Sequence, residues 1–195
     1  MAVKAPDPQK RSETARRAVL DAALALCTDE GYPSLTIEGI AARAGVSKKT
    51  IYRWWKSKGD VLLEAVVDLA NVSANHVDTG DLVEDIVTQL CAVIDLLVPH
   101  HTSAVTGLIA EALRDDAVAT ALREQLIKPN ILLFNARMQK SVERGELPAQ
   151  VDPRLLNDLL HGTIYHRLVF HLGMPDRAEL RERVKVVLAG VRATQ

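Results

Sequence analysis

The segment from Thr36 to Lys58, TIEGIAARAGVSKKTIYRWWKSK, restricts the possible fold more than any other part of the chain. A short apolar helix pattern is followed by the turn Ala44-Gly45-Val46, and Ser47 then has the residue type and position of a helix N-cap. Two short helices joined by a turn that contains glycine are typical of a helix-turn-helix. The segment therefore predicts a small helical unit built around that motif.

The second of these two helices has chemically different sides. At about 100° per residue, four cations and one tyrosine fall in a single arc of the helical wheel: Lys48, Lys49, Tyr52, Arg53 and Lys56. Apolar side chains lie beside that arc, where they can pack on the preceding helices: Ile51, Trp54 and Trp55. One side is thus predicted to be core and the other to face a charged partner.

A basic outer face on the second helix is typical of a protein that reads the major groove of DNA. Lysine and arginine bind phosphates or guanine there, and hydroxyl groups bind phosphate oxygens. Because helix N-termini offer free N–H groups to anions, Thr36 and Ser47 are candidate phosphate anchors. The alternative interpretation is a basic face that is only solvated.

Helical periodicity continues on both sides of the motif. Upstream, apolar residues from Ser12 onward recur at the spacing of one buried helix face, and Gly31 and Pro33 end that helix. Downstream, Ser57 is placed to cap a further helix, with Asp60 in its first turn, where the helix dipole favours an anion. Residues 11–70 are therefore predicted to form the DNA-binding domain. Residues 1–10 are predicted to form a flexible arm.

The remaining residues, 71–195, are also predicted to be helical and to form a regulatory domain. The expected helices cover residues 81–98, 103–113, 115–144, 153–172 and 176–191. Pro129 falls inside the third of these and should disturb it, because proline lacks an N–H donor and clashes with the preceding turn. No window alternates with period two for long enough to require a strand, so the fold class is predicted to be all-α.

Charge separates the two parts of the chain. Residues 1–60 hold 11 Lys and Arg against 7 Asp and Glu, a balance of +4, and the remainder holds 13 against 18, a balance of −5. These balances sum to the formal net charge of −1 for the whole chain. A basic N-terminal part beside an acidic C-terminal part indicates two different tasks.

The segment TIEGIAARAGVSKKTIYRWWKSKGDVL resembles the DNA-binding domain of the TetR family of transcriptional regulators, and the resemblance runs from about Arg11 to Leu69. It implies that Gly45 and Val46 form the turn of the motif. It also implies a sequence-specific regulator, usually a repressor, that binds double-stranded DNA. No cofactor is implied.

The same resemblance assigns roles within the motif. It implies that Ser47 and Thr50 contact phosphate, that Tyr52 lies on the DNA surface and that Trp55 packs into the core, while Trp54 lies near phosphate. Lys58 matches a lysine that ties the start of the next helix to the DNA backbone, and Lys49 stands where the family commonly has a small residue or proline. The predicted DNA contacts are Thr36, Ser47, Lys48, Lys49, Thr50, Tyr52, Arg53, Trp54 and Lys58.

For residues 71–195 the resemblance implies a ligand cavity and a homodimer. The last two helices would form the dimer's four-helix interface, with these residues there or in the adjoining core: Leu155, Leu156, Leu159, Leu160, Ile164, Val169, Val184, Val187 and Leu188. A pocket for a small-molecule effector would be lined by Phe134, Asn135, Met138, Tyr165 and His166. Ordinary core or interface packing is the alternative for this second set.

Other chemistries find little support in the sequence. Cys27 and Cys91 belong to no metal or redox motif and are predicted to be buried free thiols. His161, His166 and His171 are spaced by five residues, so they cannot share a helix face, and no HxxxH pair is present, which argues against a metal site. His100 and His101 follow the C-terminus of a predicted helix, where the dipole explains them. No catalytic motif is recognisable, so an enzyme is not predicted.

The expected function is a ligand-responsive repressor that binds a palindromic operator as a dimer. An activator of the same fold, or a helical interaction protein whose basic helix binds an acidic partner, is the alternative. Without an apolar leader or a long apolar run, the chain is expected in the cytoplasm of a bacterium, on the nucleoid when bound to DNA, and not in a membrane.

Overall fold

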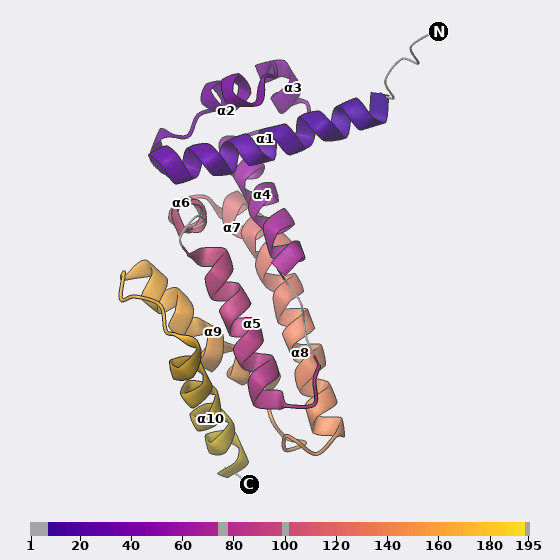
Figure 1. Ribbon diagram of the computed structural model, residues 1–195, viewed down its shortest axis with the longest axis vertical. Helices are drawn as coiled ribbons and strands as arrows, with labels where there is room; N and C mark the ends of the chain where they lie inside the picture. The colour runs from indigo at the N-terminus through magenta and orange to yellow at the C-terminus, as the bar shows by residue number, and fades with distance from the viewer. Residues whose placement is uncertain (1–7, 74–77, 99–101, 194–195) are drawn as a thin grey trace. The chain divides into compact units, whose positions relative to one another are not determined.

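A computed structural model describes residues 8–73, 78–98 and 102–193 (Figure 1). Every regular element in these ranges is a helix, which confirms the all-α prediction. The chain divides into two compact units. The first contains Met1–Asp68 and Ser103–Thr120, and the second contains Leu69–Thr102 and Ala121–Gln195. The grouping thus departs from a single boundary near residue 70, since residues 103–120 join the N-terminal unit.

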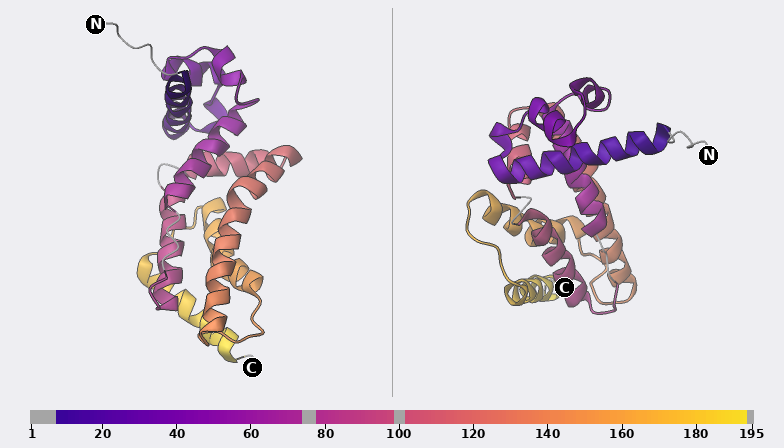
Figure 2. Two further views of the ribbon diagram at one scale, coloured as in Figure 1. Left: turned by 90° about the vertical axis from the view of Figure 1, so that its right-hand side faces the viewer. Right: turned by 45° about the horizontal axis from the view of Figure 1, so that its top comes forward.

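The first unit is built on the long helix α1 (Pro8–Glu30), against which α2 packs (Figures 1 and 2). Its other elements are the 3₁₀ turn η1 (Tyr32–Ser34), α2 (Ile37–Ala44), α3 (Lys48–Tyr52), the first part of α4 (Lys58–Ser73) and α6 (Thr102–Ala112). The apolar faces predicted for α1 and α2 meet in the core, with Ala23 and Ile40 fully buried. Helix α1 begins at Pro8, inside the predicted arm, and residues 1–7 of that arm lie outside the described residues.

Within the first unit, helix α6 packs on Tyr32 of η1 through a residue that has to be glycine. A Cβ atom on Gly107 would lie 2.3 Å from both Cβ and Cγ of Tyr32, far inside van der Waals contact. The backbone of α6 therefore touches the tyrosine side chain directly. Gly59, at the start of α4, faces the same contact, because a Cβ atom there would lie 3.0 Å from Glu111 Oε2.

The second unit contains four long helices (Figure 2): α5 (Leu82–Leu97), α8 (Lys128–Glu143), α9 (Pro153–Val169) and α10 (Arg177–Ala193). Helix α10 packs on α5 and α9, and α9 packs on α8. These bounds agree with the predicted helices to within a few residues. The aliphatic side chains of α9 and α10 that fill the core of this unit are Leu156, Leu160, Ile164, Leu168, Leu180, Val184 and Leu188.

The predicted disturbance at Pro129 takes the form of a change in helix type. Helix α7 (Asp116–Leu122) is followed by a π-helical segment, η2 (Arg123–Ile127), and α8 begins one residue before the proline. Proline cannot donate the N–H that a continuous α-helix requires, and the hydrogen-bond pattern changes to the wider π form just before it. In an α-helix the N–H missing at Pro129 would have donated to the carbonyl of Gln125. The side-chain amide of Asn130 donates nearby, to the carbonyl of Leu126 at 2.7 Å.

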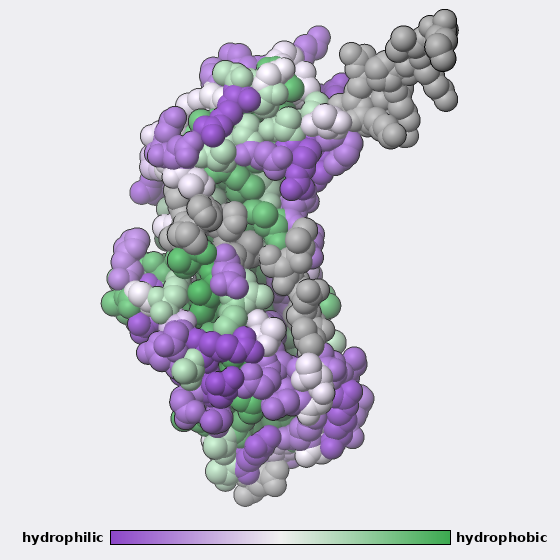
Figure 3. All heavy atoms as spheres, viewed as in Figure 1, coloured by the Kyte–Doolittle hydropathy of each residue, from purple (hydrophilic) through white to green (hydrophobic). Residues whose placement is uncertain are grey.

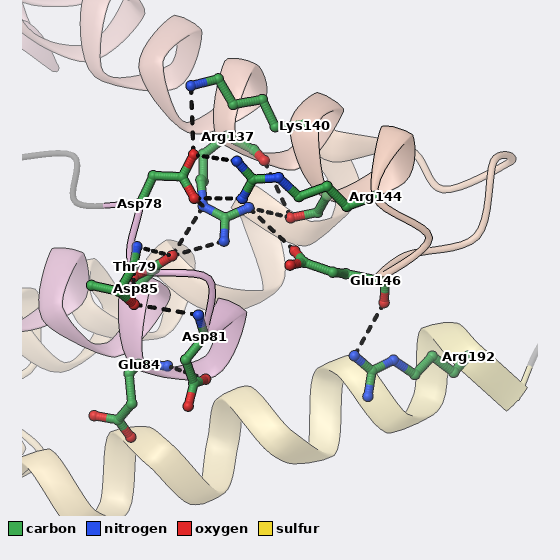
Figure 4. A network of polar contacts seen from close by, with 11 residues as sticks. Asp78, Thr79, Asp81, Glu84, Asp85, Arg137, Lys140, Arg144, Glu146 and Arg192 are labelled. Atoms are coloured by element: carbon green, nitrogen blue, oxygen red, sulfur yellow. Dashed lines mark hydrogen bonds and ion pairs between the residues drawn. The ribbon is translucent and has the colours of Figure 1, made fainter.

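A buried ion pair joins α5 to α8 in the second unit (Figure 4). Arg137 donates to Asp85 Oδ2 from Nη2 at 2.7 Å and from Nε at 3.1 Å, and both side chains are almost fully buried. Thr79 donates its hydroxyl to the other Asp85 oxygen at 2.7 Å, and Arg137 also donates to Ser141. Burial alone would raise the pKa of Asp85, but the hydrogen bonds from Thr79 and Arg137 lower it below its ordinary value.

One sequence prediction fails in this unit. Cys27 is buried as predicted, but Cys91 is partly exposed, with its sulfur 3.8 Å from Nη1 of Arg177. The residue lies on the side of α5 that meets the polar edge of α10, where Arg177 and Arg181 also pair with Glu84. His100 and His101 lie outside the described residues.

Replacing Asp85 by asparagine should destabilise the protein by about 3 kcal/mol, because the buried Arg137 would lose its nearest and most deeply buried counter-charge and keep only the more exposed Asp78 and Glu146 at 3.6 and 3.4 Å. The check is urea unfolding at neutral pH. Glu124→Gln, which breaks the exposed pair with Lys128 at 2.8 Å, is the matched control and should cost at most about 1 kcal/mol.

The ion pair between Arg137 and Asp85 also makes the stability of the protein depend on pH. A carboxyl group whose pKa is lowered in the folded state contributes stability above its unfolded pKa, and that contribution disappears as the pH falls through the folded pKa. The acid-induced loss of stability should therefore be smaller in Asp85→Asn than in the wild type. Equal pH profiles for the two proteins would contradict this account.

Candidate DNA-binding surface

The turn between α2 and α3 has the geometry that a helix-turn-helix requires. Gly45 closes α2 with φ of 66°, a left-handed conformation that glycine adopts without steric cost. Its N–H and that of Val46 donate to the carbonyls of Ala42 and Ala41 at 3.3 and 3.0 Å. Any other residue type at position 45 would be strained in this conformation, so the sequence of the turn follows from its backbone.

Both predicted N-caps are present. The Thr36 hydroxyl accepts from the Gly39 N–H at 3.1 Å and starts α2. The Ser47 hydroxyl accepts from the Thr50 N–H at 3.1 Å and starts α3, and it lies 2.9 Å from the Thr50 hydroxyl. Since each cap satisfies one N–H and leaves its neighbours in the first turn without helical partners, the geometry suits the predicted role of both helix ends in phosphate binding.

Helix α3 buries one side and exposes the other. Ile51 is completely buried and Trp55, just beyond the helix, is 4% exposed. On the opposite side Tyr52 is 55% and Trp54 38% exposed, unusually high values for such large apolar rings. The two neighbouring tryptophans thus divide as the resemblance implied, one in the core and one on the surface.

The guanidinium of Arg53 lies 5.6 Å from the centroid of the Trp54 ring, a cation–π distance. Lys49 is also exposed, and in the described part of the chain neither Lys49 nor Arg53 forms an ion pair. Lys48 differs, because its ammonium group lies 2.8 Å from the carboxylate of Glu38 on α2. Its hydrogen bond to that carboxylate raises the pKa of Lys48, so the lysine is charged at neutral pH.

A hydrogen-bonded network holds the buried side in place. The indole N–H of Trp55 donates to Glu64 Oε2 at 2.6 Å, and Arg16 donates from Nε to Glu64 Oε1 at 2.6 Å. Arg16 also reaches Asp68 at 3.1 Å. Glu64 and Asp68 lie four residues apart on α4, an acidic stripe beside its apolar face. That spacing was visible in the sequence, but its basic partner on α1 was not predicted.

Two lysines beyond the centre of α3 have contacts that the sequence did not predict. Lys56 is not part of α3, because its backbone N–H donates to Asp60 Oδ2 at 3.0 Å instead of continuing the helix. The ammonium group of Lys58 donates to the carbonyl of Tyr32 at 3.0 Å and lies 4.5 Å from the centroid of its ring. Lys58 therefore ties α4 to η1 within the first unit, and its contact with DNA stays a prediction.

The residues predicted to line a ligand pocket do not all come together. Phe134 and Met138 on α8 are fully buried, and the ring of Phe134 meets His161 of α9 edge to face at 5.3 Å. Asn135 and Tyr165 are partly buried, and burial raises the pKa of Tyr165. His166 is exposed and packs beside Phe170, so it does not join this group. His161, which the sequence suggested only as a metal ligand to be rejected, is the histidine that contacts Phe134.

The predicted interface residues divide into two sets. Leu156, Leu160, Ile164, Val184 and Leu188 are buried within the chain, so they belong to the adjoining core and offer no surface to a second copy. Leu155, Leu159 and Val169 are exposed, between 46% and 55%, and Val187 is partly exposed. On one face of the molecule such apolar side chains are visible among the polar ones (Figure 3). Phe170 and Val186 are further exposed apolar residues of this kind.

Two other kinds of site are absent from the described residues. No group of three or more His, Cys, Asp and Glu side chains in these ranges is placed to hold a metal ion. No helix within them is long and apolar enough to cross a membrane.

A glycine-closed helix-turn-helix with a basic, aromatic outer face defines the protein as a DNA-binding regulator by its fold and surface. Comparison with known proteins agrees. Residues 19–65 match the family model described as bacterial regulatory proteins, tetR family, and residues 76–187 match the tetracyclin repressor-like C-terminal domain. The chain belongs to the TetR family of transcriptional regulators, which is not a family of enzymes.

Individual relatives cover almost the whole chain. It is 32% identical over 167 residues to the DNA-binding transcriptional repressor TetR of Mycobacteroides abscessus, covering 85% of this chain and 86% of that protein. The crystal structure of the TetR family regulator SCO0332 aligns with a TM-score of 0.77 at 34% identity, over 91% of this chain and 98% of that one. The regulator FadR from Bacillus subtilis, solved with stearoyl-CoA, shares the fold with a TM-score of 0.67 at 19% identity, over 90% and 98% of the two chains.

Single alanine substitutions at Lys48, Lys49 and Arg53 should separate base reading from phosphate binding. Loss of a base-reading side chain should cost roughly 1–3 kcal/mol of DNA affinity and relax specificity at one position. Loss of a phosphate contact should weaken all sequences alike and reduce the salt slope by about one unit. The measurement is fluorescence anisotropy against duplexes at several salt concentrations.

Lys185→Ala, which removes an exposed lysine of α10, is the control for a general change of charge. Glu38→Gln is a second comparison, because it releases Lys48 without removing it. If all three alanine variants bind as the Lys185 control does, α3 is not the reading helix.

Proposed function

We propose that the chain is a homodimeric repressor that binds a palindromic operator through α3 and releases it when a small molecule binds the second unit. The observation that carries the DNA-reading role is the division of α3, with Ile51 and Trp55 buried and Tyr52, Trp54 and the cations of Lys49 and Arg53 exposed. Membership of the TetR family supports the same role. Such a protein acts in the bacterial cytoplasm, where it meets the chromosome.

A homodimer is supported by apolar side chains that the chain leaves uncovered on α9 and α10. Leu155 and Leu159 lie one helical turn apart on α9, and Gly162 continues their face, where an added Cβ atom would meet nothing within 4 Å. Val186 on α10 is 70% exposed. Apolar side chains that are left exposed together on one helix face often mark an interface. A second copy would cover it isologously, and the operator would then be a palindrome with half-sites about 34–36 Å apart.

An effector site between α8 and α9 is supported by one unsatisfied atom. Asn135 Oδ1 is buried and, among the described residues, has no hydrogen-bond partner, although a buried acceptor normally has one. Phe134, Met138 and Tyr165 provide apolar and phenolic surface on the same two helices. The relative solved with stearoyl-CoA shows that this fold accepts a ligand with a long apolar chain. We therefore propose an apolar effector with a polar group that donates to Asn135.

Repression is supported by the relative from Mycobacteroides abscessus, whose name describes a repressor. An effector relieves repression only if it binds the DNA-incompetent conformation more tightly, and a useful shift requires a few kcal/mol of difference. A reporter gene placed behind the selected operator distinguishes repression from activation, since the two change expression in opposite directions.

Selection of bound duplexes from a random pool should enrich a palindrome with the wild-type protein and no sequence with Tyr52→Ala. The reason is that Tyr52 presents both its ring and its hydroxyl on the exposed side of α3. Tyr52→Phe, which keeps the ring, is the matched variant that tests the hydroxyl alone. Enrichment of no sequence by folded wild-type protein at low salt would favour an interaction protein over a DNA reader.

Leu159→Glu should convert the dimer to a monomer, because it places a charge in the proposed interface. Leu132→Glu is the matched control, since Leu132 on α8 is exposed to a similar extent, 59% against 47% for Leu159. Light scattering after size-exclusion chromatography measures the molecular mass of the wild type and of each variant. A wild-type monomer, or an effect of equal size from both substitutions, would exclude the proposed interface.

A further inference from the structure

The contact between α6 and the start of α4 contains two polar atoms without partners. Glu111 Oε2 lies 3.0 Å, and the Tyr32 hydroxyl 3.5 Å, from the point that a Cβ atom on Gly59 would occupy. Both oxygens are buried, and neither has a hydrogen-bond partner within the described ranges. A hydroxyl donor and a carboxyl group thus both lie beside Gly59. Each buried polar atom without a partner lowers the free energy of unfolding.

The packing leaves Glu111 little room to turn away. Gly107 lies one helical turn before Glu111, on the same face of α6, and the Tyr32 side chain rests against its backbone. In this packing one oxygen of the partly exposed Glu111 side chain is held away from solvent. The state of Glu111 and the packing of α6 on the N-terminal unit are therefore linked.

The charged groups around Glu111 do not stabilise its anionic form. Asp115, one turn further along the chain, carries a like charge, and Tyr32 is a neutral phenol. On α4, the ammonium group of Lys58 is engaged with the carbonyl and ring of Tyr32. Burial, and after it the charge of Asp115, raise the pKa of Glu111 above its ordinary value.

The positive end of the α4 dipole is the remaining source of stabilisation for a carboxylate at this place. It is already offset by Asp60, whose Oδ2 accepts from the backbone N–H groups of Lys56 and Ser57 at 3.0 and 2.9 Å. The Ser57 hydroxyl accepts from the Asp60 N–H at 3.1 Å and completes the cap. Glu111 therefore meets a helix end that already carries the carboxylate of Asp60.

We propose that Glu111 carries a proton while α6 is packed on Tyr32 and Gly59, and that loss of this proton loosens the packing. The neutral carboxyl group can share a hydrogen bond with the Tyr32 hydroxyl after a small side-chain rotation, whereas the carboxylate is left buried beside Asp115. The first unit thereby contains a proton-sensitive contact outside its helix-turn-helix. Its consequence for operator binding rests on the proposed function.

Urea unfolding from pH 4 to pH 8 tests the proton directly, with wild type compared with Glu111→Gln. A glutamate with a raised folded pKa contributes stability below its unfolded pKa of about 4.3, and that contribution is lost as the pH rises through the folded pKa. Glutamine resembles the neutral form at every pH. The variant should therefore match the wild type at pH 4 and become increasingly more stable than it at higher pH.

Glu143→Gln, at an exposed position of α8, is the matched control and should show no such divergence. Tyr32→Phe should bring the wild-type loss of stability to a lower pH, because the hydroxyl would no longer support the neutral carboxyl group. A difference between wild type and Glu111→Gln that stays constant with pH, or that opens toward acid, would overturn the proposal.

Operator binding provides the second measurement, with a duplex obtained by selection and titrated at pH 6 and pH 8. The affinity of the wild type should change with pH, by at most about tenfold per pH unit for one proton, and that of Glu111→Gln should change less. Identical pH profiles would exclude a link between this proton and DNA binding. If no duplex is selected at all, the proposed function fails, while the unfolding series still decides the state of Glu111.

Discussion

The position of the reading helix depends on the carboxylate of Glu64. Helix α3 contains five residues, Lys48–Tyr52, too few to persist in isolation. Its place is fixed by the burial of Ile51 and Trp55 and by the indole N–H that Trp55 donates to Glu64, whose second oxygen accepts from Arg16. One carboxylate thus joins α1, the end of the reading segment and α4, so the presentation of the outer face follows from a contact on the inner one.

The side chains on the outer face of α3 and of the residues just after it make few contacts within the protein. Arg53 stacks near the exposed Trp54 ring, and Lys48 pairs with Glu38 at the surface. An exposed ion pair of this kind is worth about 1 kcal/mol at most, so a phosphate can replace Glu38 as the partner of Lys48 at small cost. Lys58 is different, because its charge is used between Tyr32 and α4. The cations of the segment therefore differ in their partners within the protein: Lys48 pairs with a surface carboxylate, and Lys58 with a backbone carbonyl and a ring.

The second unit uses charge in the opposite way, as part of its interior. The pair between Arg137 and Asp85 fixes α8 against α5, and the π-helical turn before Pro129 lets α8 continue from α7 (Figure 4). The same helix carries Asn135, whose side-chain oxygen is buried without a partner in the described residues. A firmly anchored helix with one unsatisfied acceptor is well suited to bind a ligand, because the acceptor is held in place before the ligand arrives.

The sequence by itself determined the local structure: the caps at Thr36 and Ser47, the left-handed turn at Gly45, the disturbance at Pro129 and the fold class. These follow from hydrogen bonds and backbone conformations within a few residues, which neighbours in sequence specify. Only the tertiary structure decided which side chains meet across the chain. Helical periodicity shows that a residue faces inward but not which helix it faces. For that reason Leu156 and Leu159, both predicted at an interface or in the adjoining core, differ in burial. The contact of Glu64 with Arg16, and the approach of Glu111 and Tyr32 to Gly59, were invisible in the sequence.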